Sequence, residues 1–456
     1  MPMQFCCQSG GNMLQWKQLH GIGDCMSKKR ILPFPPMGWN SWDCYGAAVN
    51  EEQLLGNAAY MAKHLKKYGW EYIVCDIQWS EPNANGNDYT PFTELCMDEF
   101  SRLIPAENRF PSSSGGRGFR PIADKIHAMG LKFGIHIMRG IPRQAVHRNT
   151  KLWGTDKTAR EIAQSYSVCP WNTDMYGVDS QKDGAQAYYD SLFSLYAEWG
   201  VDFVKVDDIA NTEFLPDNPY SARAEIEMIR KALNNCGRDM VLSLSPGPAP
   251  ISAAQHLSDH ADMWRMTGDF WDRWDKLYAM FERCEAWYPY VGRGGYPDCD
   301  MLPLGRLCKN APCCGDQNRY TNFTLDEQKT MLTLWSVFRS PLMLGGELRE
   351  NDAQTNALLQ NEEVIYVNQH GKNPHPVPIA DVNFRLWTSQ GENGETFFAV
   401  FNISDETHTV KLHTEVEGLA DSTCIRDLWA QADIQKSAGA FGCTLPAHAS
   451  GLYQIK

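Results

Sequence analysis

The sequence predicts an α/β chain: a (β/α)8 TIM barrel followed by a C-terminal antiparallel β-sandwich. Three observations predict this fold. Short apolar runs alternate with amphipathic stretches over most of the chain, polar or aromatic residues recur where those runs end, and the pattern becomes wholly strand-like after about Gly371. A length of 456 residues suits a barrel with a smaller second module.

Eight short apolar runs are interpreted as the barrel strands, and the stretches between them repeat apolar residues at helical spacing. The runs are Gly38–Trp42, Tyr72–Ile77, Lys132–Met138, Phe203–Asp207, Met240–Ser245, Met263–Met266, Met301–Leu304 and Pro341–Leu344. The clearest helical stretches are Glu51–Tyr68, Ala185–Trp199 and Ala222–Leu233. A doubly wound sheet is the alternative, but no GxGxxG turn follows the first run.

The two ends of the chain differ in character from the barrel. We expect the barrel over residues 26–371 and the sandwich over 372–456, where the strand-like runs are Asn383–Thr388, Thr396–Asn402, Thr407–Leu412 and Gly451–Ile455. The sandwich is expected to pack against the barrel, with a sugar-binding module as the alternative. Residues 1–25 show no period and no secretory-signal pattern, so they are interpreted as an unstructured extension or a start assigned too far upstream. A cytoplasmic location is therefore expected.

Composition excludes several classes of partner. The 42 basic and 55 acidic side chains give a net charge of −13, which disfavours nucleic acid and anionic membranes. No apolar stretch approaches the length of a membrane span. The 15 cysteines lack the repeated CxxC spacing of a zinc framework, and mostly free thiols in a reducing compartment are expected.

Two carboxylates at predicted strand ends indicate catalysis. Lys205 and Asp207 share a face of their strand because successive residues point to opposite faces. Asp269 follows the end of another apolar run. Glycoside hydrolysis requires two such acids, one to attack the anomeric carbon and one to protonate the leaving oxygen and then activate water. A pair of structural ion pairs is the alternative interpretation.

Seven motifs in order give the chain a family resemblance. They are Pro36-Met37-Gly38-Trp39-Asn40-Ser41-Trp42, Arg109-Phe110-Pro111, Gly130-Leu131-Lys132-Phe133-Gly134-Ile135, Val204-Lys205-Val206-Asp207, Trp264-Arg265 with Asp269, Asp300-Met301-Leu302, and Leu359-Gln360-Asn361-Glu362-Glu363-Val364-Ile365. Over residues 34–371 the chain resembles glycoside hydrolase family 27, which contains α-galactosidases, α-N-acetylgalactosaminidases and β-L-arabinopyranosidases. The resemblance implies a retaining exo-glycosidase on a (β/α)8 barrel, without a metal or organic cofactor.

The resemblance also implies roles for individual residues. Asp207 matches the family's nucleophile and Asp269 its acid/base. Lys205 matches a lysine that hydrogen-bonds sugar hydroxyls, Arg265 an arginine on the side of the sugar's 2-position, and Trp42 an aromatic wall against the sugar's apolar face. Core packing is the alternative for Trp42 and for Trp79, and an ion pair with Asp269 or Asp272 is the alternative for Arg265.

One departure from the family pattern bears on the sugar. The family usually has two adjacent acids at the second strand end, which hold the 4- and 6-hydroxyls in its galactosidases, but this chain has Asp76-Ile77. An isoleucine cannot accept a hydrogen bond, and burying a 6-hydroxyl without a partner costs about 1–3 kcal/mol. The wall suits L-arabinopyranose, which has galactose's ring stereochemistry without the hydroxymethyl group. The alternative is that Ile77 points into the core and Gln78 or another loop supplies the contact.

Other departures leave alternatives open. Ser245 stands where a galactosidase typically places a glutamate against the 2-hydroxyl, so it either leaves room for an acetamido group or bonds an ordinary hydroxyl. His136 stands in place of a tyrosine and either lines the pocket or is a core histidine. Asp208 usually is a neutral residue in the family, and its parity points it away from Asp207.

The expected activity is release of a terminal galactose-configured sugar, most simply β-L-arabinopyranose. An α-galactosidase or an α-N-acetylgalactosaminidase is the alternative, and a non-catalytic sugar-binding protein is a remote one. A metal-dependent barrel hydrolase would require a His-x-His pair at a strand end, which the third run, with His136 alone, does not supply. The expected partner is a small glycoside or oligosaccharide, and homo-oligomerisation is left open.

Overall fold

The computed structural model describes residues 31–436 and 439–456. The interpretation of residues 1–25 as an extension lies outside the described residues. Within the described ranges, no helix is both long and apolar enough to cross a membrane.

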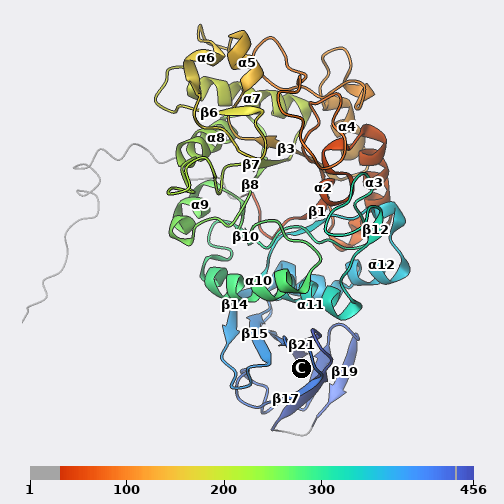
Figure 1. Cartoon of the computed structure of the whole chain (residues 1–456). Coiled ribbons are helices and arrows are strands. Elements are labelled where there is room, and N and C mark those ends of the chain that lie inside the picture. Colours follow the sequence, from red (N-terminus) through yellow and green to blue (C-terminus); the bar gives the residue numbers. More distant parts are fainter. Residues whose placement is uncertain (1–30, 437–438) are drawn as a thin grey trace, which may run out of the picture.

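Eight parallel strands form the predicted barrel (Figure 1), paired in the spatial order β10-β9-β8-β7-β3-β2-β1-β13. An isolated parallel bridge between Leu302 and Leu344 joins the segment after β10 to β13, and so spans the remaining gap in the ring. In chain order the strands are β1 (Met37–Asn40), β2 (Tyr72–Cys75), β3 (Lys132–Met138), β7 (Phe203–Asp207), β8 (Val241–Leu244), β9 (Met263–Arg265), β10 (Tyr296–Asp298) and β13 (Leu342–Leu344).

The prediction for the seventh barrel strand is wrong. Tyr296–Asp298, and not Met301–Leu304, pairs with β9. Strand propensity favours the apolar run and disfavours a segment that contains Pro297 and an aspartate. The backbones of Tyr296 and Asp298 make the hydrogen bonds to the β9 segment, so the missing N–H of Pro297 points away from that segment and weakens no bond of this pair.

Helices cover the outside of the barrel, and the three predicted ones are present. Glu51–Tyr68 is helix α3 (Glu51–His64) followed by a 3₁₀ turn over Lys66–Tyr68. Asn50 and Gln53 form a capping box that satisfies the first N–H groups of α3. The other helices are α2 (Trp42–Tyr45), α4 (Arg120–Ala128), α7 (Ala185–Trp199), α8 (Arg223–Asn235), α9 (Ala254–His260), α10 (Trp274–Trp287), α11 (Leu325–Phe338), α12 (Ala353–Leu359) and α13 (Glu362–His370).

A long insertion follows β3 before helix α7 begins. It contains α5 (Arg143–Arg148), α6 (Ala159–Ile162) and a small sheet of β4 (Ile141–Pro142), β5 (Ala163–Gln164) and β6 (Met175–Val178). A separate two-stranded sheet, β11 (Arg306–Leu307) with β12 (Arg319–Tyr320), lies between β10 and α11 in the chain. Both insertions follow the ends of barrel strands, which is where a TIM barrel has its functional loops.

The C-terminal region is an antiparallel two-sheet domain, as predicted. One sheet has the order β14-β15-β16-β21-β18-β19 and the other pairs β17 with β20. The strands are β14 (Lys372–Val377), β15 (Phe384–Gln390), β16 (Thr396–Asn402), β17 (His408–Leu412), β18 (Cys424–Asp427), β19 (Ala432–Gln435), β20 (Phe441–Leu445) and β21 (Ser450–Ile455). The sequence reading missed four of them. Strand β14 contains two prolines and lies at a sheet edge, and β19 is exposed throughout, so neither has the alternation that marks a strand.

Helix α11 joins the two parts of the molecule and lies between them in Figure 1. Eleven of its fourteen side chains are buried, and it contacts β16 and β21 of the C-terminal domain. The indole of Trp429 donates a hydrogen bond to Thr333 on this helix at 2.8 Å. Trp335 of α11 and Phe401 of β16 belong to one continuous apolar core, whereas Phe398 lies in a second core inside the sandwich.

Ten of the twelve described cysteines are free thiols. The remaining two, Cys308 and Cys313, form a disulfide that the sequence did not predict. The loop that they close is held against the first strand end, because the N–H of Cys308 donates to the backbone carbonyl of Asp43 at 2.9 Å.

Candidate active site

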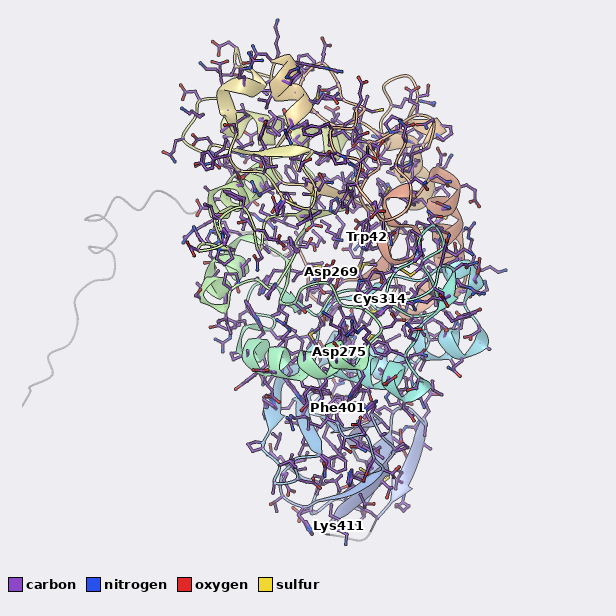
Figure 2. The ribbon with its side chains drawn as sticks, in the orientation of Figure 1. Trp42, Asp269, Asp275, Cys314, Phe401 and Lys411 are labelled. Atoms are coloured by element: carbon purple, nitrogen blue, oxygen red, sulfur yellow. A yellow bond between two sulfur atoms is a disulfide. The ribbon has the colours of Figure 1, made fainter. Side chains whose placement is uncertain are left out.

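The carboxyl ends of the barrel strands surround a cavity of about 360 Å³. Seven of the nine predicted site residues line it: Trp42, Asp76, Ile77, Lys205, Asp207, Arg265 and Asp269. They come from the ends of four strands, β1, β2, β7 and β9, with Asp269 in the turn after β9. Figure 2 labels Trp42 and Asp269 over the centre of the barrel, and labels Lys411 at the far end of the C-terminal domain. The structure therefore brings these seven predicted residues together around one cavity.

Strand parity accounts for the position of the predicted nucleophile. In β7, Val204 and Val206 are fully buried in the apolar core, whereas Lys205 and Asp207 reach the cavity. The neighbouring strand β3 runs parallel, with His136 beside Lys205 and Met138 beside Asp207.

His136 contacts the predicted nucleophile and does not itself line the cavity. Its Nε2 lies 3.1 Å from Oδ2 of Asp207, and its side chain is 1% exposed. An ionised carboxylate only accepts hydrogen bonds, so the imidazole is the donor. Of the two alternatives left open by the sequence, the structure places His136 as a buried histidine, which contacts the cavity residue Asp207.

Ser245 also lies outside the cavity lining. Its hydroxyl is buried and its Oγ lies 3.5 Å from the carbonyl of Val206, to which it donates. The next residues, Pro246 and Gly247, line the cavity in its place. Gly247 approaches the following strand end closely, because an added Cβ would lie 2.1 Å from the carbonyl oxygen of Thr267. The predicted contact of Ser245 with the sugar stays a prediction.

Positive neighbours keep Asp207 ionised. Burial would raise the pKa of Asp207, but the hydrogen bond and charge of His136, with the charges of Lys205 and Arg265, outweigh it and hold the pKa well below its usual value. An ionised carboxylate is the form that a nucleophile needs.

Asp76 and Lys205 form a buried ion pair in the cavity lining. Lys205 Nζ donates to Asp76 Oδ2 at 2.9 Å, and Asn40 Nδ2 donates to the same oxygen at 2.6 Å. Burial opposes both charges, yet the attraction between them lowers the pKa of Asp76 and raises that of Lys205. The charge of Asp207 adds to the rise for Lys205, and the charge of His136 and the hydrogen bond from Asn40 add to the fall for Asp76. Both groups are therefore held charged, with polar atoms available to sugar hydroxyls.

Arg265 bridges two acids in the cavity lining. Its Nη2 donates to Asp269 Oδ1 at 3.0 Å, and its Nη1 lies 2.9 Å from Asp300 Oδ1. The alternative of an ion pair with Asp269 is thus present in the structure, whereas Asp272 pairs with Arg319 instead. Asp269 is 69% exposed and lies at the cavity lining, so it is open both to solvent and to a bound glycoside.

Ile77 forms part of an apolar and aromatic wall. It lines the cavity and packs in a cluster with Met138 and Met175. Trp42 and Tyr89 stack in this wall, with centroids 6.1 Å apart and planes 18° apart, and Trp171 packs on Tyr89. Trp79, by contrast, packs in the core and donates its indole N–H to the carbonyl of His136 at 2.7 Å.

Several cavity residues were missed by the sequence reading: Asp43, Tyr89, Trp171, Glu213, Phe270, Trp271, Asp300 and Met301, besides Pro246, Gly247 and Gly268. Asp300 and Met301 stand in one of the seven family motifs, but the resemblance assigned them no role. Tyr89 and Trp171 come from long segments between strands and helices, where no periodicity marks a functional position. Asp43 directly follows Trp42, and burial together with the charge of Asp300 raises its pKa well above the usual value.

Asp208 lies behind the nucleophile, as its strand parity predicted. Its carboxylate lies 2.8 Å from Arg139 Nη2, and Arg139 also pairs with Glu225 at 2.9 Å. Oδ1 of Asp208 is buried without a hydrogen-bond partner. Burial, offset only in part by Arg139, raises the pKa of Asp208 to about 7.

Comparison with known proteins agrees with this architecture. Residues 172–370 match the family model "Alpha galactosidase A", and residues 381–455 match "Alpha galactosidase C-terminal beta sandwich domain". The α-galactosidase of Cyamopsis tetragonoloba is 25% identical over 98% of this chain and 93% of its own length.

Two bacterial structures are much more similar. A family 27 β-L-arabinopyranosidase from Geobacillus stearothermophilus is 56% identical, with a TM-score of 0.90 over 93% of this chain and 96% of its own, and one of its variants is solved with arabinose. A Bacillus halodurans C-125 protein, provisionally described as an α-N-acetylgalactosaminidase, is 51% identical, with a TM-score of 0.84 over 94% and 99% of the two chains. The chain therefore belongs to glycoside hydrolase family 27, and it is a glycosyl hydrolase.

Proposed function

We propose that this glycosidase is a retaining exo-enzyme that releases terminal β-L-arabinopyranose from small glycosides or oligosaccharides. The observation that carries the choice of sugar is Ile77, an apolar side chain in the cavity wall beside Asp76. The 56% identity to a β-L-arabinopyranosidase supports the same choice.

The reaction proceeds by two displacements. In the first, an oxygen of Asp207 attacks the anomeric carbon, while Asp269 gives its proton to the glycosidic oxygen and the C–O bond to the leaving group breaks. In the second, Asp269 takes a proton from water, whose oxygen attacks the same carbon and releases Asp207 as a carboxylate. Configuration at that carbon is inverted twice and so retained.

The charges around the two acids suit these roles. His136, Lys205 and Arg265 hold Asp207 ionised, so attack requires no prior loss of a proton. Asp269 is largely exposed and therefore reachable by the leaving group and then by water. Its partner Arg265 is shared with Asp300, which lies in the same cavity wall.

The wall around Ile77 suits a sugar without an exocyclic hydroxymethyl group. Asp76 offers carboxylate oxygens to ring hydroxyls, whereas Ile77 and its apolar neighbours Met138 and Met175 offer no partner to a 6-hydroxyl. Leaving that hydroxyl buried and unpaired costs about 1–3 kcal/mol, which corresponds to roughly 5- to 150-fold in kcat/KM against a galactoside.

The test compares kcat/KM on three matched nitrophenyl glycosides: β-L-arabinopyranoside, α-D-galactopyranoside and α-N-acetylgalactosaminide. We expect the arabinoside to be preferred in the wild type and in Ile77→Val, and Ile77→Asp to shift the preference toward the galactoside. A wild-type preference for either galactose-configured hexoside would overturn the arabinopyranosidase assignment and leave the alternative activity in its place. Asp207→Asn is expected to abolish turnover while sugar binding remains, and unchanged turnover would contradict the nucleophile.

A further inference from the structure

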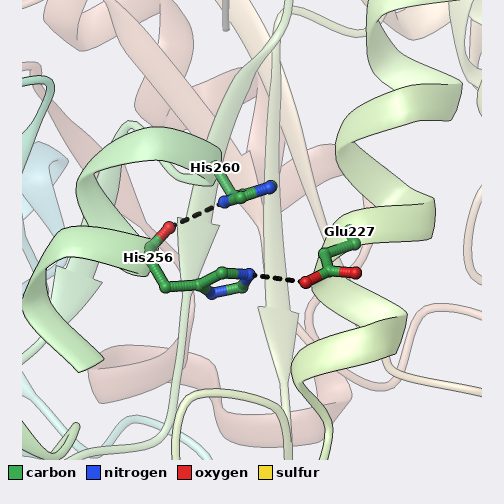
Figure 3. A group of neighbouring side chains, drawn as sticks. All are labelled: Glu227, His256 and His260. Carbon is green, nitrogen blue, oxygen red and sulfur yellow. Dashed lines mark hydrogen bonds and ion pairs between the residues drawn. The ribbon is translucent and has the colours of Figure 1, made fainter. Parts of the chain in front are cut away.

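Two histidines and a glutamate meet on the outside of the barrel, away from the cavity (Figure 3). His256 and His260 lie on α9, and Glu227 lies on the neighbouring helix α8. One ligand atom from each residue lies within 4.8 Å of the others. None of the three lines the catalytic cavity.

The spacing of the histidines places both rings on one side of α9. Residues four apart on a helix are neighbours on its surface, and two histidines at this spacing are a recurring zinc-binding arrangement. The two rings are stacked, with centroids 4.0 Å apart and planes 24° apart. Glu227 then approaches from α8, with its Oε1 3.1 Å from Nε2 of His256.

Hydrogen bonds already fix which nitrogen of His260 is free to bind. Its Nδ1 lies 2.8 Å from the backbone carbonyl of His256, and because a carbonyl only accepts, Nδ1 carries the hydrogen. The lone pair is therefore on Nε2, which points toward α8 and Glu227 in Figure 3. A second ring nitrogen that bonds to a backbone carbonyl is the usual support of a metal-binding histidine.

His256 has the same kind of support. Its Nδ1 lies 2.8 Å from the hydroxyl of Tyr220, which leaves Nε2 directed at Glu227. Glu227 as a carboxylate only accepts, so without an ion Nε2 carries the hydrogen and the tyrosine hydroxyl donates to Nδ1. A metal ion at Nε2 would displace that hydrogen, and the tyrosine oxygen can then accept from Nδ1–H. His256 is nearly buried, whereas the carboxylate of Glu227 is 48% exposed and gives an ion a route from solvent.

We propose that Glu227, His256 and His260 bind a divalent transition metal ion of the zinc class. Two imidazole nitrogens and one carboxylate oxygen suit Zn²⁺ at about 2.0–2.2 Å, with water as the fourth ligand. The three ligand atoms lie within 4.8 Å of one another, so side-chain rotations have to bring them closer to reach that geometry. Arg223 now donates to the Oε1 of Glu227 at 3.2 Å, and it competes with the cation.

The position of the site gives it a structural role. Tyr220 belongs to the segment between β7, which ends in Asp207, and helix α8, and α9 leads into β9, which ends in Arg265. The ion would join α8 to α9 and, through Tyr220, the segment that follows the nucleophile strand. It takes no part in the two displacements, so its loss lowers stability and leaves the chemistry in place.

The experiment measures zinc bound by the full chain. Protein stripped with chelator is incubated with ZnCl2 and gel-filtered, and zinc is counted by mass spectrometry, with the affinity taken from calorimetric titration. Cysteines elsewhere can also bind zinc, so the decisive quantity is the difference between the wild type and His260→Gln. We expect one zinc per chain fewer in His260→Gln and in Glu227→Gln. The matched control His147→Gln, an exposed histidine outside the cluster, is expected to keep the full content.

Two further variants sharpen the test. Tyr220→Phe is expected to weaken zinc binding by about 10- to 100-fold because it removes the support of His256. Arg223→Ala is expected to tighten binding severalfold because it removes a competing cation. Zinc should raise the Tm of the wild type and leave that of His260→Gln unchanged, with circular dichroism to establish that each variant is folded. Equal zinc content in the wild type and His260→Gln, or no zinc retained by the wild type, would overturn the proposal.

Discussion

The Nε2 atom of His136 lies 3.1 Å from Oδ2 of Asp207, and the two side chains come from the adjacent parallel strands β3 and β7. This hydrogen bond is one of the contributions that lower the pKa of the predicted nucleophile. It gives a buried histidine a function that does not require it to touch the sugar.

Replacement of His136 by phenylalanine should raise the pKa of Asp207. The acid limb of the kcat/KM profile reports the free nucleophile, so it should move to higher pH. A hydrogen bond to a charged group contributes about 1.5–3 kcal/mol, and kcat/KM should fall by roughly 10- to 150-fold. His136→Asn, which keeps an N–H donor, should recover part of the loss. An acid limb that does not move in the phenylalanine variant would show that His136 does not tune Asp207.

Lys205→Met should lower the free energy of unfolding far more than the substitution of a surface lysine does. It leaves the carboxylates of Asp76 and Asp207 without their shared cation, and breaking a buried pair costs about 3–5 kcal/mol. Lys132→Met is the matched control, because Lys132 pairs with Glu71 at 2.7 Å on the surface and such pairs contribute about 0–1 kcal/mol. Urea unfolding measures both. Comparable losses in the two variants would refute the structural role of the Lys205–Asp76 pair.

Asp269→Ala tests the acid/base assignment and the retaining mechanism together. Without its proton donor, hydrolysis of a glycoside with a poor leaving group should slow by about 10²- to 10⁴-fold, while an activated dinitrophenyl glycoside should suffer less in the first displacement. Azide, which needs no general base, should then restore turnover and give a glycosyl azide of retained configuration. A product of inverted configuration, identified by NMR, would rule out the double displacement.

The raised pKa of Asp208 predicts that the free energy of unfolding falls as pH rises. Its folded pKa of about 7 lies above the unfolded value of about 3.9, so the native state holds a proton that the unfolded chain releases. Stability from this group is fully present below about pH 4 and is lost as pH rises toward about 7. In Asp208→Asn the fall in the free energy of unfolding over this window should be smaller than in the wild type. Parallel curves from urea unfolding across the window would contradict the raised pKa.

The sequence predicted those parts of the site that sit directly on regular strands. Lys205 and Asp207 alternate with buried valines, and this period of two is enough to assign them to one face of the strand. The prediction of the seventh strand was wrong because the observed strand lacks such a pattern. Its observed residues include Pro297 and an aspartate, and it is specified by pairing with β9 and not by its own propensity.

Residues from irregular segments could not be predicted. Tyr89 and Trp171 reach the cavity from connections without a repeating pattern. The stacking of Tyr89 on Trp42, and the packing of Trp171 on Tyr89, depend on how those connections fold over the strand ends. The contact of His136 with Asp207 could not be predicted either. The alternation of side chains along a strand assigns a residue to one face of the sheet, but it does not give the distance between side chains on neighbouring strands.

Helix α11 has a consequence for the folding of the whole chain. Its side chains are buried partly by the barrel and partly by β16 and β21, and Trp335 shares a core with Phe401. Neither part alone can complete the surroundings of this helix, so the described chain should unfold in one cooperative calorimetric transition. A chain cut after residue 371 would expose that apolar face and aggregate, which makes the C-terminal domain a requirement for a soluble barrel.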